Sequence, residues 1–423
     1  MKIKWFILLL ILLIPPSVSA QYVSAKQGED LTLKLAVIGP GNQLYFWWGH
    51  IGLIVEDRST GESWFFDWGV FSFDTENFFL NFAFGRLVYS CMASMAEPYY
   101  NHYIRTNRDI TLYTLDLPPE KKEEILLFAA VNMLPENRDY LYHHFYDNCA
   151  TRIRDIIDLG LDGQFKAKYS EIPSRFTLRQ QVRRHTWFSP FFDWILNFWM
   201  GQVIDVPMTV WDDMFLPSEI GKHAADFSYI DPDGNERSLV SNIETIFLSS
   251  GRPIVLDEPR LQWPRNLIAG LLFSSFLVIV SLKKGETRGF RIFAGLVQSF
   301  FGLFLGIAGS MLFFMMFFTL HDYTFQNINI IYINPLFLAA LPLGIIISFS
   351  KIEKRRILAI KISRAFWVYV FCGALITILI KVFPAFFQQN QVTQSMMIPL
   401  SLAMIFIFSL LERRLGKSGP GRI

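Results

Sequence analysis

The sequence has few charged residues and few cysteines. Asp, Glu, Lys and Arg make up 18% of its 423 residues, against about 25% in an ordinary soluble domain, whereas apolar residues make up 52%. This balance excludes a wholly soluble chain and a wholly disordered one. The formal net charge is only +2, so the chain lacks the overall positive field of a nucleic-acid-binding protein, and we expect no nucleic-acid partner.

Familiar metal and cofactor signatures are also missing. The three cysteines, Cys91, Cys149 and Cys372, lie too far apart in the sequence for a shared metal site. The sequence contains no zinc-protease, serine-hydrolase or dinucleotide-binding motif. We therefore expect neither a metal nor a cofactor. An odd cysteine count leaves at least one thiol unpaired within the chain.

Residues 1–20 have the pattern of a secretory signal peptide. Lys2 and Lys4 precede an apolar stretch, which ends in the small residues of Val18-Ser19-Ala20. Cleavage is predicted after Ala20, and an uncleaved anchor is the alternative. From residue 21 to 265, charged and apolar residues mix as in a globular domain, and the length suits one domain or one domain with an appendage.

The region 266–411 is predicted to cross a membrane five times, and residues 412–423 form a tail. The apolar runs lie at 267–282, 292–320, 335–350, 366–383 and 396–411. Basic residues, which mark cytoplasmic loops, occur after the first and third runs and in the tail, whereas loops 321–334 and 384–395 have none. The 21–265 domain should therefore lie outside the cytoplasm and the C-terminus inside it.

A candidate nucleophile lies in the segment Tyr146-Asp147-Asn148-Cys149-Ala150-Thr151-Arg152-Ile153. Asn148 or Asp147 is a good N-cap, which places Cys149 in the first turn of a helix that Gly160 would end. The unpaired N–H groups and positive dipole end of such a turn stabilise a thiolate. A buried structural cysteine, or a disulfide with Cys91, is the alternative interpretation.

His50 is the best candidate for a base. It lies in a predicted strand, Trp48-Gly49-His50-Ile51-Gly52-Leu53-Ile54-Val55, and a second strand follows near 63–69. If Asp57 pairs with Glu62, then His50 and Asp67 share a face of neighbouring strands, where the carboxylate can orient the imidazole. A slip of one residue would turn Asp67 away, and Glu56 and Asp147 are then the reserve candidates.

A histidine-bearing strand about a hundred residues before an Asn-Cys helix start resembles the circularly permuted papain-like fold of lecithin:retinol acyltransferase. The resemblance implies an α+β extracytoplasmic domain, with an antiparallel sheet and helices, before the α-helical membrane domain. More specifically, four segments resemble the Lnb family, the Bacteroidota-type lipoprotein N-acyltransferases: 64–69 (WFFDWG), 146–155 (YDNCATRIRD), 211–217 (WDDMFLP) and His321-Asp322.

The resemblance implies a two-step acyl transfer with Cys149 as nucleophile and His50 as base. A membrane phospholipid would donate the acyl chain, and the diacylglyceryl cysteine at a lipoprotein N-terminus would accept it. The resemblance further implies an inner-membrane protein with a periplasmic catalytic domain. A membrane-anchored cysteine hydrolase of the phospholipase or amidase kind, and a non-enzymatic membrane assembly protein, are the alternatives.

Other residues are candidates for contact with lipid or substrate. Residues 187–200 form an aromatic segment, with Ser189 as N-cap and Asp193 and Asn197 as a narrow polar stripe. This helix is predicted either to lie at the membrane interface or to be a buried core helix. Candidate substrate-binding residues are Asn148, Arg86, His321 and Asp322.

Overall fold

The computed structural model describes residues 28–417 except 75 and 286, so the predicted signal peptide lies outside the described residues. The chain divides into two compact units. The first comprises Met1–Phe82, Arg86–Phe176 and Pro207–Ile254, and the second Ala83–Gly85, Thr177–Val206 and Val255–Ile423. The stretch Thr177–Val206, which the sequence analysis included in one domain over 21–265, is thus grouped with the later part of the chain.

An antiparallel sheet forms the centre of the first unit. Among the described residues it has seven strands in the order β6-β4-β3-β2-β1-β5-β9. The strands are β1 (Leu31–Ile38), β2 (His50–Asp57), β3 (Glu62–Val70), β4 (Val88–Met95), β5 (Ile110–Leu115), β6 (Asp139–Leu141) and β9 (Val240–Phe247). A short hairpin, β7 (Ser228–Ile230) and β8 (Glu236–Ser238), pairs separately.

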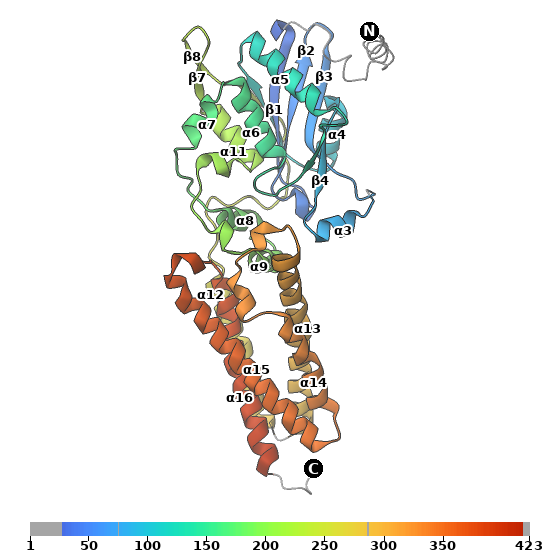
Figure 1. The fold of residues 1–423 in the computed structure, drawn as a ribbon, viewed down its shortest axis with the longest axis vertical. Helices are drawn as coiled ribbons and strands as arrows, with labels where there is room; N and C mark the ends of the chain where they lie inside the picture. The colour runs from blue at the N-terminus through green and yellow to red at the C-terminus, as the bar shows by residue number, and fades with distance from the viewer. Residues whose placement is uncertain (1–27, 75, 286, 418–423) are drawn as a thin grey trace, which may run out of the picture. The chain divides into compact units, whose positions relative to one another are not determined.

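Helices cover both faces of this sheet (Figure 1). The alternation of β2 directs Ile51, Leu53 and Val55 to a core shared with α5 and α6, and Ile54 to a smaller core against α4. The helices of this unit are α3 (Phe78–Ala83), α4 (Ala96–Arg105), α5 (Pro119–Asn132), α6 (Cys149–Gly160), α7 (Gln164–Tyr169), α10 (Val210–Asp213) and α11 (Pro217–Ala225), with 3-10 turns η1 (Gly28–Asp30) and η2 (Leu44–Phe46).

Among its described residues, the second unit contains five helical segments long and apolar enough to cross a membrane, as the sequence predicts. Their bounds are Trp263–Lys284, Arg288–Phe318, Ile328–Phe349, Glu353–Val382 and Gln391–Leu415, so each apolar run extends into its flanks. The helices are α12 (Trp263–Lys284), α13 (Arg288–Phe318), α14 (Ala340–Phe349), α15 (Glu353–Leu379) and α16 (Gln391–Lys417), with 3-10 turns η4 (Asp322–Thr324), η5 (Ile328–Ile331), η6 (Pro335–Ala339), η7 (Ile380–Val382) and η8 (Pro384–Phe386).

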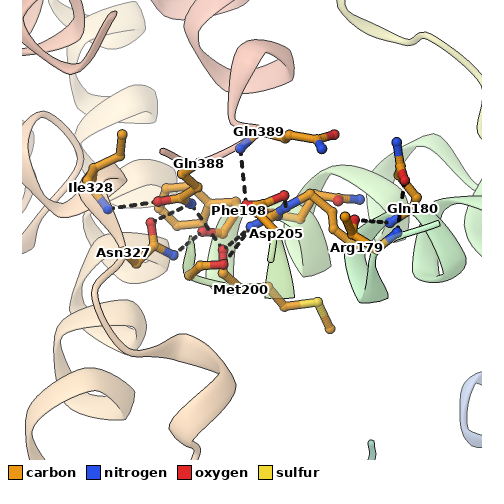
Figure 2. A network of polar contacts seen from close by, with 12 residues as sticks. Arg179, Gln180, Phe198, Met200, Asp205, Asn327, Ile328, Gln388 and Gln389 are labelled. Atoms are coloured by element: carbon orange, nitrogen blue, oxygen red, sulfur yellow. Dashed lines mark hydrogen bonds and ion pairs between the residues drawn. The ribbon is translucent and has the colours of Figure 1, made fainter. Parts of the chain in front are cut away.

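The unit also includes α8 (Leu178–Thr186), α9 (Pro190–Trp199) and η3 (Gln202–Ile204). A buried polar network joins this segment to the loops between the long helices (Figure 2). Arg179 pairs with Asp205 at 2.8 Å, both fully buried, and donates to the carbonyls of Asn197, Met200 and Gly201 at the end of α9. These bonds satisfy carbonyls that a helix C-terminus leaves without partners.

Amide side chains from two loops complete the network (Figure 2). Asn327 donates to the carbonyls of Phe198 and Trp199, and Gln388 donates to that of Met200. The backbone N–H of Gln389 donates to Asp205 at 3.1 Å. Every one of these groups is buried or partly buried, so the segment 177–206 is fixed to the loops after α13 and α15.

Helix α9 begins after Ser189, as predicted, but its polar stripe points inward. Asp193 is fully buried and accepts a hydrogen bond from Thr186 at 2.8 Å, while Asn197 is 5% exposed. The aromatic side is the partly exposed one: 54% of Phe191 is accessible, and Trp194 stacks on Phe304 of α13. The helix is therefore a packed element of the second unit that keeps an exposed aromatic edge.

Candidate active site

Cys149 is the first residue of α6, as the sequence predicts. The Asn148 side chain caps the helix: its Oδ1 accepts from the N–H groups of Ala150 and Thr151 at 2.8 and 2.9 Å, and the Thr151 hydroxyl accepts from the Asn148 N–H at 2.8 Å. This capping box fixes the first turn and leaves the half-buried thiol at the positive end of the helix dipole.

The other end of the Asn148 amide anchors the turn to its surroundings. Its Nδ2 donates to the carbonyl of His144 at 2.8 Å and to that of Phe215 at 3.1 Å. Both polar atoms of the side chain are thus used within the protein. Asn148, a candidate substrate-binding residue, is thus the N-cap of the helix that begins at Cys149.

His50 and Asp67 meet across neighbouring strands. Asp57 pairs with Glu62, which is the register that the sequence prediction required. His50 Nε2 lies 3.0 Å from Asp67 Oδ1, and both side chains are largely buried. The imidazole is also hydrogen-bonded to Cys149. Since Asp67 occupies Nε2, Nδ1 is the nitrogen available to the thiol.

Gly69 makes room for this arrangement. A Cβ at this position would lie 2.5 Å from Cε1 of His50, a distance that no side chain tolerates. The Gly69 N–H also donates to Asp67 Oδ1 at 2.6 Å, and the Tyr99 hydroxyl from α4 hydrogen-bonds the same carboxylate. The carboxylate is therefore held by three different elements.

The His50 imidazolium and the Asp67 carboxylate each stabilise the charged form of the other. Burial alone would lower the pKa of His50, but the carboxylate of Asp67 and then the sulfur of Cys149 favour the imidazolium, and together they raise the pKa above its ordinary value. Burial alone would raise the pKa of Asp67, but the His50 imidazolium and the Gly69 hydrogen bond hold it below its ordinary value. At neutral pH the proton therefore resides on His50, next to the Cys149 sulfur.

A pocket of about 400 Å³ opens beside His50 and Asp67. This volume lies within the range of small-molecule sites, about 300–1,000 Å³. Its wall is mainly aromatic and apolar. The lining residues are Phe46, His50, Asp67, Gly69, Val70, Phe71, Pro98, Tyr99, His102, Tyr103 and Arg108.

Arg108 places a buried cation in the wall of this pocket. Its Nε donates to the carbonyl of Gly39 at 2.9 Å, and its guanidinium stacks on the rings of Phe46 and Tyr103, 4.5 and 5.0 Å from their centroids. Burial lowers the pKa of Arg108 to about 10, which still leaves it charged at neutral pH.

The cysteines form no disulfide. Cys91, Cys149 and Cys372 are all described, and all three thiols are free. Cys91 is buried in the sheet, and burial raises its pKa to about 12, so it stays a neutral thiol. The alternative of a Cys91–Cys149 bridge is therefore wrong.

The reserve carboxylates have other partners. Glu56 pairs with Lys34 at 2.7 Å, and Asp147 forms a two-pronged pair with Arg152 at 2.5 and 2.7 Å. Neither is the carboxylate that contacts His50. The register-based choice of Asp67 is thus the one with the required geometry.

The remaining candidates lie elsewhere. Arg86 is exposed at the turn before β4, where its N–H donates to the carbonyl of Asn81. His321 and Asp322 belong to the second unit and follow the end of α13; His321 is buried, and its Nδ1 lies 2.9 Å from the hydroxyl of Tyr323. The structure brings together Cys149, His50 and Asp67, with Asn148 behind them.

Sequence reasoning missed Tyr99, Tyr103 and Arg108. They lie in α4 and in the turn that follows it, about 30 to 60 residues from His50 and Asp67, and no local pattern indicates which face of the sheet α4 covers. The cluster Tyr99-Tyr100-Asn101-His102-Tyr103 at the end of an apolar-poor helix is the one signal that could have drawn attention to it.

Comparison with known proteins gives one family match. Residues 20–184 match the family model described as the Lnb N-terminal periplasmic domain. This stretch, which is less than half of the chain, is similar to that family. Together with the five candidate spans among the described residues, the match to a periplasmic domain indicates a multi-pass membrane protein. Neither the curated proteins nor the solved structures contain a match to the chain.

Proposed function

We propose that the chain is a lipoprotein N-acyltransferase. It would move an acyl chain from a membrane phospholipid, through a thioester on Cys149, to the α-amine of the diacylglyceryl cysteine at a lipoprotein N-terminus. The observation that carries the proposal is the hydrogen-bonded series Cys149, His50 and Asp67, with the cysteine at a helix N-terminus. The match to the Lnb N-terminal periplasmic domain and the candidate membrane spans support this class of substrate.

The first step forms the acyl-enzyme. The Cys149 sulfur attacks the ester carbonyl carbon of the phospholipid, and a carbon–sulfur bond forms. The ester carbon–oxygen bond then breaks, and His50 Nδ1 gives its proton to the departing alkoxide of the lysophospholipid. Because Asn148 accepts from the N–H groups of Ala150 and Thr151, we assign the N–H of Cys149 to the developing oxyanion.

The second step transfers the chain. The lipoprotein α-amine attacks the thioester carbonyl, a carbon–nitrogen bond forms, and the carbon–sulfur bond breaks. His50 takes the proton that the amine loses, which restores the starting pair of His50 and Cys149. A thioester is less stable than an amide, so the second step runs downhill and the reaction as written has no further co-reactant.

The predicted location follows from the loops. Lys and Arg are concentrated in the loops around 283–291 and 351–364 and in the tail, which favours the cytoplasmic side for these segments. The Lnb N-terminal domain would then face the periplasm from the inner membrane. Phospholipid and lipoprotein N-termini are both embedded at that membrane surface, where the Cys149 site must reach them.

A reconstituted assay tests the proposal. The full chain in vesicles with labelled phospholipid should transfer label to a diacylated lipopeptide, and Cys149→Ala should abolish the transfer. Cys91→Ala is the matched control, because it removes the other thiol of this unit. Transfer that survives Cys149→Ala would contradict the mechanism, and release of free fatty acid alone would indicate a cysteine hydrolase instead.

A further inference from the structure

Helix α3 exposes large apolar side chains. Phe79 is 74% exposed and Leu80 57%, on a helix of only six residues with no described buried position. Such side chains lie ordinarily in a core, and adjacent exposed ones mark an interaction site. Neither takes part in the chemistry proposed for Cys149.

Behind these side chains, aromatic rings form a continuous series. Phe79 contacts Phe78 edge-on, with ring centroids 5.5 Å apart; Phe78 contacts Phe73 at 5.0 Å; and Phe73 contacts Phe71 at 5.1 Å. Phe71 also lies 6.1 Å from Phe78 and stacks with it. We call Phe71, Phe73, Phe78 and Phe79 the aromatic path.

The inner end of the aromatic path is the candidate active site. Phe71 lines the pocket together with His50 and Asp67, and Tyr45 links it to Phe46 on the same wall. An apolar chain that follows the rings inward from Phe79 therefore arrives beside the imidazole. The aromatic path is the apolar wall that connects this pocket with an exposed helix.

The residues at the end of α3 and directly after it, Ala83–Gly85, belong to the second unit. The Phe84 ring lies edge-on to Phe314 of α13, with centroids 5.5 Å apart, and the Phe84 carbonyl accepts from the N–H of Leu320 at 2.9 Å. Phe314 belongs to a candidate span, so Phe84, which follows α3 directly, packs against a candidate membrane helix.

We propose that the aromatic path is the route by which an acyl chain of a membrane phospholipid enters the active-site pocket, with Phe79 and Leu80 set in the lipid. A hydrocarbon chain is the occupant that matches an all-apolar series of rings that begins at exposed apolar side chains and ends at the pocket lined by His50 and Asp67. This proposal rests on the proposed function, because the acyl transfer is what gives the route its purpose.

Photo-crosslinking tests the route without turnover. The full chain carrying Cys149→Ala is placed in phosphatidylcholine vesicles doped with a lipid that bears a diazirine in its acyl chain, and crosslinked residues are mapped by mass spectrometry. Crosslinks are expected within 71–82 besides the spans. Phe79→Ser/Leu80→Ser should lower the yield at the remaining positions of 71–82 at least about tenfold, since the transfer of even one such apolar side chain into lipid is worth about that factor.

Leu248→Ser/Ile243→Ser is the matched control. It removes two apolar side chains of the first unit, 71% and 52% exposed, that lie off the aromatic path, and it should leave the crosslinks unchanged. Crosslinks restricted to the five spans, or a yield within 71–82 that the α3 variant does not change, would overturn the route.

A rate comparison separates this proposal from the proposed function. With active protein, the rate of Cys149 acylation is measured with vesicle phospholipid and with a water-soluble short-chain ester. Phe79→Ser/Leu80→Ser should lower the ratio of the first rate to the second about tenfold. Crosslinks on 71–82 without any acyl adduct on Cys149 would uphold the route and refute the transferase. An adduct with an unchanged rate ratio would uphold the transferase and overturn the route.

Discussion

At the scale of single residues, the proton of His50 decides how the site works. The imidazole sits between a carboxylate 3.0 Å from Nε2 and the Cys149 thiol, and both raise its pKa. In the proposed reaction the protonated His50 donates its proton to the leaving group, and Asp67 would act through His50 as a positioning residue.

Asp67→Asn tests this role through the pH profile. With a neutral amide, burial dominates and the pKa of His50 falls. Since acyl-enzyme formation uses the protonated imidazole, its rate is retained at low pH and lost as pH rises through the His50 pKa. The alkaline limb should therefore move to lower pH, with a loss at neutral pH of roughly 10²-fold.

Stopped-flow or quenched measurement of thioester formation across pH 5–10 would record that limb. Glu56→Gln is the control, because it neutralises a carboxylate of the same strand pair that contacts Lys34 and not His50. A lower rate with an unmoved alkaline limb would show that Asp67 does not set the protonation of His50.

Gly69→Ala tests the space that His50 needs. The added Cβ would meet the imidazole at 2.5 Å, so the ring must rotate away from Asp67 or Cys149. Thioester formation should fall by at least about tenfold, because small displacements of reacting groups are costly. Gly289→Ala, where a Cβ meets nothing within 4 Å, is the control and should react at the normal rate. Equal rates for both variants would contradict the assignment.

How much of the site the sequence predicts depends on distance along the chain. The contact of His50 and Asp67 was predictable because a short hairpin fixes their register through Asp57 and Glu62. The presence of Tyr99 and Arg108 in the pocket wall was not predictable, because it depends on which face of the sheet α4 covers.

At the scale of elements, caps and buried polar contacts fix the parts that carry the site. Helix α6 was predicted with its cap and its end, because Asn148 and Gly160 are strong local signals. For α9 the bounds were predictable, but the direction of its polar stripe was not. A polar stripe of Asp193 and Asn197 can face either water or a buried polar partner. In this structure the Thr186 hydroxyl is the buried partner of Asp193.

Arg179→Met tests the buried network of Figure 2. The change leaves Asp205 as a buried charge without its cation and removes donors from the carbonyls of Asn197, Met200 and Gly201. We expect a loss of about 3–5 kcal/mol, or roughly 10 °C in the melting temperature of this unit in detergent.

The control for Arg179→Met is Asp162→Asn. It breaks an exposed ion pair with Lys121 on the first unit and should change stability by less than about 1 kcal/mol. A melting temperature for Arg179→Met equal to that of the control would show that the network does not hold 177–206 to the loops after α13 and α15.

At the scale of the whole molecule, composition predicted more than motifs did. Long apolar runs predicted all five candidate spans, because a bilayer dictates both length and polarity. The α+β class of the first unit was predicted from the resemblance carried by the His50 strand and the Asn148-Cys149 helix start. The grouping of 177–206 with the spans was not, because it depends on side chains such as Asn327 and Gln388 that lie far along the sequence.

The central claim is that Cys149 carries an acyl group during turnover. Intact-protein mass spectrometry of the full chain, incubated with a phospholipid of defined chain length, tests it most directly. The account predicts a mass increase equal to one acyl group, mapped to Cys149, absent from Cys149→Ala, and removed when a diacylated lipopeptide is added. Acyl transfer to the lipopeptide without any such adduct on Cys149 would contradict it.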